Sequence, residues 1–185
     1  MRGLAVPALL LAGCGTAPAF DRPEPDYGRP FEIVLTQYSV PVVWGLANPG
    51  AVGGWDDSIT LRGFTQGITH RPVAHDVDDG FVNYVLHPLA GSETHLMARR
   101  HGWSFGAAFL FDVFASVSWE YFFENVFERP SRIDLMTTAP IGALLGELRW
   151  ALKRAGVGFV DPLGGCEPVL EMTREGPVIG VEIRW

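Results

Sequence analysis

The stretch WSFGAAFLFDVFASVSWEYFFENVFERP, residues 103–130, decides the fold class because it is too long for a strand and has the pattern of one helix. Ser104 stands where an N-cap belongs, and helices usually end before a proline such as Pro130. Polar residues recur every four positions within this otherwise apolar run, which places them on one helix face: Asp112, Ser116, Glu120 and Glu124. The stretch therefore predicts a long helix with a single polar stripe.

A second helix is predicted before it, over residues 79–102. It begins in a polar turn that contains Asp79 and stops at Gly102, with cationic side chains in its last turn, where they suit the helix dipole. Pro88 lies inside this helix and removes one backbone donor. We therefore expect a kink near His87.

The third predicted helix covers residues 139–156. Pro140 occupies its first position, where a missing N–H costs nothing, and Gly156 is its stop. Ahead of it, the run SRID at residues 131–134 indicates a short turn capped by Ser131.

The remaining segments favour β-structure. Residues 31–80 predict short strands and loops, because β-branched side chains are dense over residues 33–43, with a break near Pro41. Residues 166–185 alternate with a period of two and predict a half-buried β-hairpin. The predicted fold is therefore mainly α, a compact bundle of three principal helices with short flanking β-strands and a C-terminal β-hairpin.

The N-terminus predicts export. MRGLAVPALLLAGC combines Arg2 with an apolar run that ends at Cys14, and the run is shorter than the roughly 20 residues needed to span a bilayer. LAGC resembles the bacterial lipobox, so residues 1–13 are predicted to be a lipoprotein signal peptide and Cys14 the lipidated residue. The alternative is an ordinary signal peptide that contains a cysteine.

The segment after Cys14 predicts how the domain is held. Residues 14–30 are rich in proline and have no apolar period, which is typical of an extended tether. Gly15, where an aspartate would favour retention in the inner membrane, indicates the outer membrane by resemblance to enterobacterial sorting. We expect a lipid-anchored protein of the outer membrane that faces the periplasm.

The charge of the chain limits its partners. The formal net charge is −7, and no cationic stripe is visible. Nucleic-acid binders need clustered Lys and Arg, so a nucleic-acid partner is excluded. The expected partners are the membrane, through the lipid anchor, and an outer-membrane protein.

Polar residues on all three predicted helices define a candidate site. The first helix carries Asn83, His87, Gly91 and His95 at four-residue spacing, and the third carries Gly142, Gly146 and Glu147. If these stripes face inward, His87, Glu120 and Glu147 meet around one buried point. Such a cluster could act as an acid–base pair or hold a divalent metal, although no cofactor is otherwise expected. The supporting polar residues would be Asn83, Ser116, Glu124 and Asp134.

Two other readings of the same residues stay open. The polar groups could form a paired network that only orients the helices, or the stripe on residues 112–124 could be a solvated helix face. We also expect Asp134 to be a helix cap, and His95 and His101 to be surface residues. The loop histidines His70 and His75 are expected to be solvated.

Several motifs carry a family resemblance. NYVLHPLAG, GWSF, SVSWEYFFE, RPSRIDLMTTAPIGALLGE and DPLGG together resemble the bacterial envelope family called domain of unknown function 3943, DUF3943. The resemblance covers residues 81–165. The matching positions are Asn83, His87, Pro88, Gly91, Gly102, Ser104, Phe105, Ser116, Trp119, Glu120, Pro130, Ser131, Asp134, Thr138, Gly142, Gly146 and Glu147.

The resemblance implies a helical envelope domain, which longer members follow with an outer-membrane β-barrel, and it supplies no reaction. This chain resembles a lipoprotein-type member without that barrel. Ile141 stands where members often have a second glycine, which puts the closest helix approach there in question.

These observations predict a cell-envelope lipoprotein that acts as a non-enzymatic binding or assembly accessory at the outer membrane. The alternative is a membrane-proximal hydrolase or metal-dependent enzyme that uses the His/Glu cluster. A third possibility is that the C-terminal hairpin adds to the exposed sheet edge of a partner.

Overall fold

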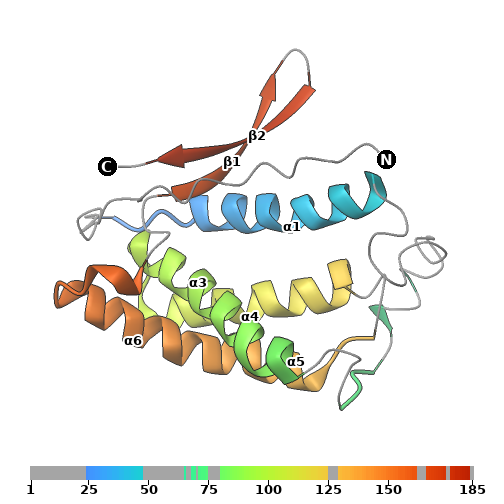
Figure 1. The fold of residues 1–185 in the computed structure, drawn as a ribbon, viewed down its shortest axis with the longest axis horizontal. Coiled ribbons are helices and arrows are strands. Elements are labelled where there is room, and N and C mark those ends of the chain that lie inside the picture. Colours follow the sequence, from blue (N-terminus) through green and yellow to red (C-terminus); the bar gives the residue numbers. More distant parts are fainter. Residues whose placement is uncertain are drawn as a thin grey trace, which may run out of the picture.

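The computed structural model describes residues 24–47, 65, 68–69, 71–74, 80–124, 129–161, 166–173 and 176–183. These residues are mainly helical, which confirms the predicted class (Figure 1). The helical elements are α1 (Arg29–Ala47), η1 (Val82–Leu86), α3 (His87–Arg100), α4 (Phe105–Ser118), η2 (Trp119–Phe123), α5 (Arg132–Met136), η4 (Thr137–Ile141), α6 (Gly142–Arg154) and η5 (Gly158–Val160).

Figure 1 shows how these elements are layered. Helix α1 lies over α3 and α4, and α6 lies on the opposite side of α3. Strands β1 (Cys166–Thr173) and β2 (Gly176–Ile183) pair antiparallel, with Cys166 opposite Ile183, and β1 contacts α1. The sequence predicted that this hairpin is half-buried, with one side facing the protein. That prediction concerns side chains that the structure does not describe.

The strand prediction for the first part of residues 31–80 is wrong, because Arg29–Ala47 forms helix α1 and continues through Pro41. Ile33 and Val34 are buried in the core, with exposures of 1% and 2%. The preference of β-branched residues for strands amounts to about 1 kcal/mol and depends on context. Burial of these two side chains against α3 and α4, worth about 1.5–3 kcal/mol each, outweighs it.

Three of the predicted helix ends are confirmed, whereas the predicted start at Asp79 and the last turn before Pro130 lie outside the described residues. The Ser104 side chain accepts a hydrogen bond from the Ala107 backbone N–H at 3.2 Å and caps α4. Gly102 and Gly156 end α3 and α6 with φ of 83° and 87°, a left-handed conformation that glycine adopts without a Cβ clash.

Pro88 and Pro140 lie beside and inside π-helical turns, respectively, which the sequence did not predict. The His87 backbone N–H donates to the Val82 carbonyl five residues back, so the wide turn η1 stands directly before Pro88. The prediction that Pro140 begins a helix is wrong. Pro140 lies inside η4, because α5, η4 and α6 form one continuous helical run. A π-turn suits these positions because it relieves the lost donor and the ring clash that proline brings to a regular helix.

Helices α3 and α6 approach each other closely through Gly91, Gly142 and Gly146, which are the glycines of the predicted stripes. A Cβ on Gly91 would lie 1.8 Å from the Thr138 carbonyl oxygen, and one on Gly142 would lie 2.7 Å from Gly91 Cα. Ile141, which stands where family members often have glycine, is 48% exposed and lies outside this contact. The isoleucine therefore does not prevent the close approach of the helices.

The apolar core lies on the other side of α3, between α1, α3 and α4. It consists of Ile33, Val34, Met97, Ala98, Trp103, Ala108, Phe111 and Ala115. In the described part of the chain, no helix is both long enough and apolar enough to cross a membrane.

Candidate functional site

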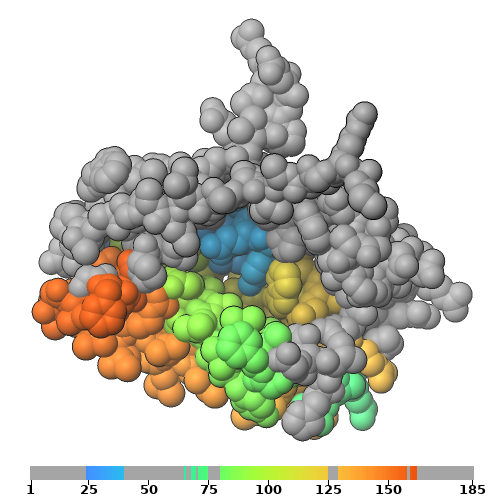
Figure 2. Space-filling model, viewed as in Figure 1, coloured from blue at the N-terminus to red at the C-terminus, as the bar shows by residue number. Residues whose placement is uncertain are grey.

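A pocket of about 380 Å³ lies where α1, the η1–α3 run, the α4–η2 run and η4 meet. Figure 2 shows a hollow among these elements, with α1 in blue behind α3 in green and α4 in yellow. The described lining residues are Tyr38, Val82, Leu86, His87, Ala90, Gly91, Thr94, Asp112, Ala115, Ser116, Trp119, Glu120, Glu124 and Thr138.

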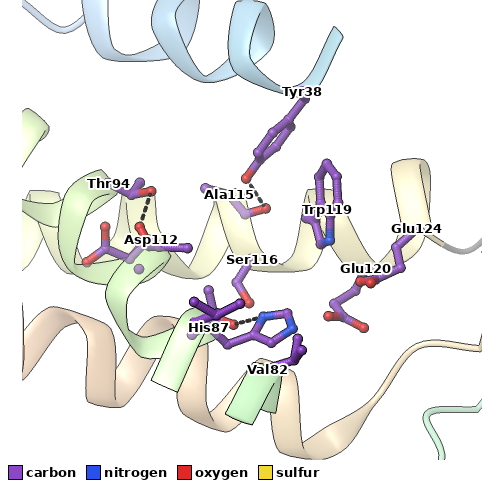
Figure 3. Close-up of a pocket in the computed structure, with 14 residues that line it drawn as sticks. Tyr38, Val82, His87, Thr94, Asp112, Ala115, Ser116, Trp119, Glu120 and Glu124 are labelled. Atoms are coloured by element: carbon purple, nitrogen blue, oxygen red, sulfur yellow. Dashed lines mark hydrogen bonds between the residues drawn. The ribbon is translucent and has the colours of Figure 1, made fainter. Parts of the chain in front are cut away.

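The polar stripe of α4 and η2 faces this pocket (Figure 3). Asp112, Ser116 and Glu120 are only 1%, 4% and 2% exposed, so the reading of the stripe as a solvated face is wrong. The outward face of α4 is instead apolar, with Leu110 and Phe114 exposed at 68% and 51%. Helix α4 therefore turns its polar side inward, and these buried polar groups require hydrogen-bond partners inside the domain.

His87 is held from two directions. Its Nδ1 lies 3.0 Å from Thr138 Oγ1, and its Nε2 lies 3.5 Å from Asp134 Oδ1. Asp134 was predicted to be a helix cap, but the cap of α5 is the Ser131 side chain, which accepts from the Asp134 backbone N–H. The buried Asp134 carboxylate is thereby left to face His87.

Glu120 is bound to the start of α5. Its Oε2 accepts a hydrogen bond from the Ser131 backbone N–H at 2.9 Å, in a buried position. The same start is tied to the segment at residues 71–74, because the Val73 N–H donates to the Pro130 carbonyl at 2.8 Å. Glu120 therefore lines the pocket and also fixes one of its walls.

Glu147 does not join His87 and Glu120, which corrects the predicted cluster. Its Oε2 lies 3.1 Å from His95 Nε2 and 3.0 Å from Arg99 Nε, and it does not line the pocket. His95 was predicted to be a surface residue, but it is fully buried and its Nδ1 lies 2.7 Å from Asp112 Oδ2. The reason is Gly146, where an added Cβ would lie 2.7 Å from His95 Cβ.

The groups behind the pocket form a chain of opposite charges: Asp112, His95, Glu147 and Arg99. Burial acts to lower the pKa of His95, but hydrogen bonds and attraction to Asp112 and Glu147 outweigh it and raise the pKa. Burial raises the pKa of Asp112 to about 6, against the opposite pull of His95. Burial, with a smaller effect from Asp112, also raises the pKa of Tyr38.

Two buried polar atoms of the pocket lining lack a hydrogen-bond partner among the described residues, namely Asp112 Oδ1 and Ser116 Oγ. An unsatisfied buried polar group costs about 1–3 kcal/mol, so native proteins rarely retain one without a reason. Figure 3 shows Ser116 pointing from α4 into the space beside His87. Both atoms are shielded from solvent, and the Asp112 side chain is 0% exposed, so they belong to the packed wall behind the pocket.

The other predicted residues are placed as follows. Asn83 is buried in η1, and Glu124 is half-buried and lines the pocket. His101, predicted to be on the surface, is buried and its Nδ1 donates to the Met97 carbonyl at 2.9 Å. Cys14, His70 and His75 lie outside the described residues. No group of three His, Cys, Asp or Glu side chains in the described ranges is arranged to hold a metal ion.

Comparison with known families now identifies the helical region. Residues 72–157 match the family model described as "Domain of unknown function (DUF3943)". This region is a DUF3943 domain. The predicted family is thereby confirmed, and the matched residues of the DUF3943 domain include His87, Asp112, Glu120 and Thr138. The chain matches no curated protein and no solved structure.

Sequence reasoning missed three residues of this region. Tyr38, which precedes the DUF3943 domain, lines the pocket from α1, where a strand was predicted. Thr138 was known only as a family position, and His95 was assigned to the surface although it shares the four-residue spacing of His87. That spacing was the available signal for His95, whereas nothing in the sequence indicated Tyr38.

Proposed function

We propose that this protein is a bacterial envelope lipoprotein whose DUF3943 domain binds a small amphipathic molecule in the pocket, and that it serves as a binding accessory at the outer membrane. The observation that carries the proposal is the pocket itself, about 380 Å³ in volume, whose described lining combines apolar side chains with a few polar ones.

The form of the pocket supports a small amphipathic ligand. Its volume of about 380 Å³ falls at the lower end of the range of about 300–1,000 Å³ for small-molecule sites. Its lining combines polar residues of α4 with apolar residues of η1, such as Val82 and Leu86. A mostly apolar pocket with a few placed polar groups is the usual form of such sites.

The contacts of His87 and Glu120 favour binding over catalysis. A general base needs a nitrogen or oxygen that can reach the substrate proton. Both ring nitrogens of His87 already face Thr138 and Asp134, and Glu120 accepts from a backbone N–H. The hydrolase alternative also required Glu147 beside His87, and Glu147 pairs with His95 and Arg99.

The N-terminal pattern supports the location in this proposal. The signal at residues 1–13, the lipidated Cys14 and the tether at 14–30 would hold the domain at the outer membrane, facing the periplasm. The C-terminal segment, predicted as a half-buried β-hairpin, would be the surface available to an outer-membrane partner protein.

Native mass spectrometry of the protein extracted from membranes in mild detergent tests the proposal. The wild type should carry a bound small molecule, and Ala90→Phe should lose it, because Ala90 lines the pocket from an exposed position where a ring can fill the opening. Leu89→Phe is the matched control, since the neighbouring Leu89 is exposed and does not line the pocket. If all three proteins appeared only at the mass of their own chain, without a bound small molecule, the proposal would be refuted.

A further inference from the structure

The outward face of α4 is apolar and exposed to solvent. Its residues recur every three or four positions and therefore share one side of the helix, namely Gly106, Leu110, Val113, Phe114 and Val117. Leu110 and Phe114 are 68% and 51% exposed, and the two valines are also exposed. A continuous exposed apolar surface marks a place where a membrane or another protein binds.

This face carries no charge. Asp112 and Glu120 are the only charged residues between Phe105 and Phe123, and both are buried on the inward side of the helix. The side chains of the face also offer no hydrogen-bond donor or acceptor, whereas protein–protein interfaces carry about one hydrogen bond per 100–200 Å². Acyl chains need no such bonds, so the composition of the face favours lipid over a protein partner.

The tether meets the domain at the start of α4. The Asp26 backbone N–H donates to the His101 carbonyl at 3.0 Å, and the Trp103 Nε1–H donates to the Asp26 carbonyl at 2.7 Å. His101 and Trp103 stand within four residues of Phe105, where α4 begins. The chain that leads from the proposed anchor therefore enters the domain at the N-terminal end of α4.

The proposed anchor is close enough to bring this face to the membrane. Glu24, the first described residue, follows Cys14 by ten positions. An extended chain spans at most about 3.6 Å per residue, so the acyl chains attach within about 36 Å of Glu24. Helix α4 has 14 residues and is about 21 Å long, so its whole face can lie against the same leaflet.

Aromatic residues of the N-terminal segment continue the face. The ring of Phe31 on α1 lies 5.4 Å from the ring of Phe114, and Phe31 is 37% exposed. Tyr27 is 55% exposed, and its ring lies 5.0 Å from that of Trp103. Tyrosine is enriched at the level of the lipid head groups, because its ring is apolar and its hydroxyl is polar. The edge of the face nearest the tether is therefore suited to a membrane surface.

We infer that the outward face of α4 rests on the membrane that holds the anchor, with Leu110, Phe114 and Val117 inserted among the acyl chains. This inference rests on the proposed lipid anchor and adds the surface by which the domain lies on the bilayer. Helices with one apolar face bind membranes in this way, parallel to the surface.

Spin labels on the lipidated protein in phosphatidylcholine vesicles test this inference. Cys166→Ser removes the other thiol, and Leu110→Cys then carries one nitroxide on the face. Leu89→Cys is the matched control, because Leu89 is 44% exposed on α3, outside the face. Oxygen gathers among acyl chains, whereas a polar nickel chelate stays in water. The label at position 110 should collide mainly with oxygen, and the label at position 89 mainly with the chelate.

Two further substitutions move the face off the membrane and back. Val117→Glu in the protein labelled at position 110 should lower the ratio of membrane-bound to free face by about tenfold or more, because a charge replaces an apolar side chain in the lipid. Adding Gly106→Leu should restore the ratio, since a Cβ at Gly106 meets no atom within 4 Å and the new side chain extends the face. Such a rescue would exclude misfolding as the cause of the loss.

The outcomes separate this inference from the lipid anchor. Protein that floats with the vesicles while its label at position 110 collides with the chelate would overturn the inference alone. Magnetic broadening between labels at position 110 would also overturn it, because a second copy of the chain would then cover the face, and so would an unchanged ratio in Val117→Glu. Protein that does not float with the vesicles would overturn both the anchor and the inference.

Discussion

Gly91 and Gly142 meet backbone to backbone where α3 crosses α6, so closely that a Cβ on Gly142 would lie 2.7 Å from Gly91 Cα. This contact sets the spacing of the polar residues on both sides of it. His87, one turn before Gly91, reaches Thr138, and His95, one turn after it, reaches Glu147. The pocket and the charged network behind it therefore depend on the same glycine contact.

Gly91→Ala should lower the free energy of unfolding by about 3 kcal/mol or more, because its Cβ would lie 1.8 Å from the Thr138 carbonyl oxygen and two helices would have to separate. Gly106→Ala in α4 is the matched control, with no atom within 4 Å of the added methyl group. It should raise stability by up to about 1 kcal/mol through helix propensity. Urea unfolding measures both, and equal effects would contradict the close approach.

The raised pKa of His95 predicts that stability falls as the pH rises above neutral. A histidine whose pKa is higher in the folded state than its unfolded value of about 6.5 stabilises the fold. This stabilisation is fully present below the unfolded pKa, and it is lost as the pH rises through the folded pKa. The melting temperature should therefore decrease between about pH 6.5 and 9. In His95→Gln this slope should be flatter, and an unchanged slope would show that His95 is not protonated between Asp112 and Glu147.

Asp161→Ala should destabilise the domain by about 3–5 kcal/mol, because it leaves the buried Arg100 and the half-buried Lys153 without their partner. Asp161 Oδ1 lies 2.7 Å from Arg100 Nη1, and Oδ2 lies 2.5 Å from Lys153 Nζ. Glu32→Ala is the control, since Glu32 is 68% exposed beside Arg29 and should cost less than about 1 kcal/mol. Chemical denaturation that gave both variants the same loss would argue against a buried ion network.

Cys14→Ser should abolish incorporation of radiolabelled palmitate in a bacterial host, because the acyl chains attach through the cysteine thiol. The variant should also remain as a longer precursor, since lipoprotein signal cleavage follows lipidation. Wild-type protein that is processed and released without label would instead indicate an ordinary signal peptide.

Much of the site could be predicted from periodicity. Residues four apart on a helix share one face, and Asp112, Ser116 and Glu120 do face inward together. Cap residues have local causes, so Ser104 and Gly102 were predictable as well. These features depend only on the chain within a few positions of each residue.

Features that depend on distant contacts were not predictable. Glu147 contacts His95 and not His87, because Gly146 lets α3 approach α6 closely beside His95. The spacing of residues within one helix does not reveal this contact between helices. The β-branched residues of α1 favoured a strand, and only the core between α3 and α4 gives Ile33 and Val34 a reason to be helical. The π-turns η1 and η4 likewise arise where a proline meets a helix that tertiary packing keeps continuous.

A crystal structure of the mature protein purified from membranes in mild detergent tests the central claim most directly. The account predicts density for a small amphipathic molecule in the pocket, in contact with Val82, Leu86 and Glu120. An empty pocket, or one filled by side chains of the protein itself, would contradict it.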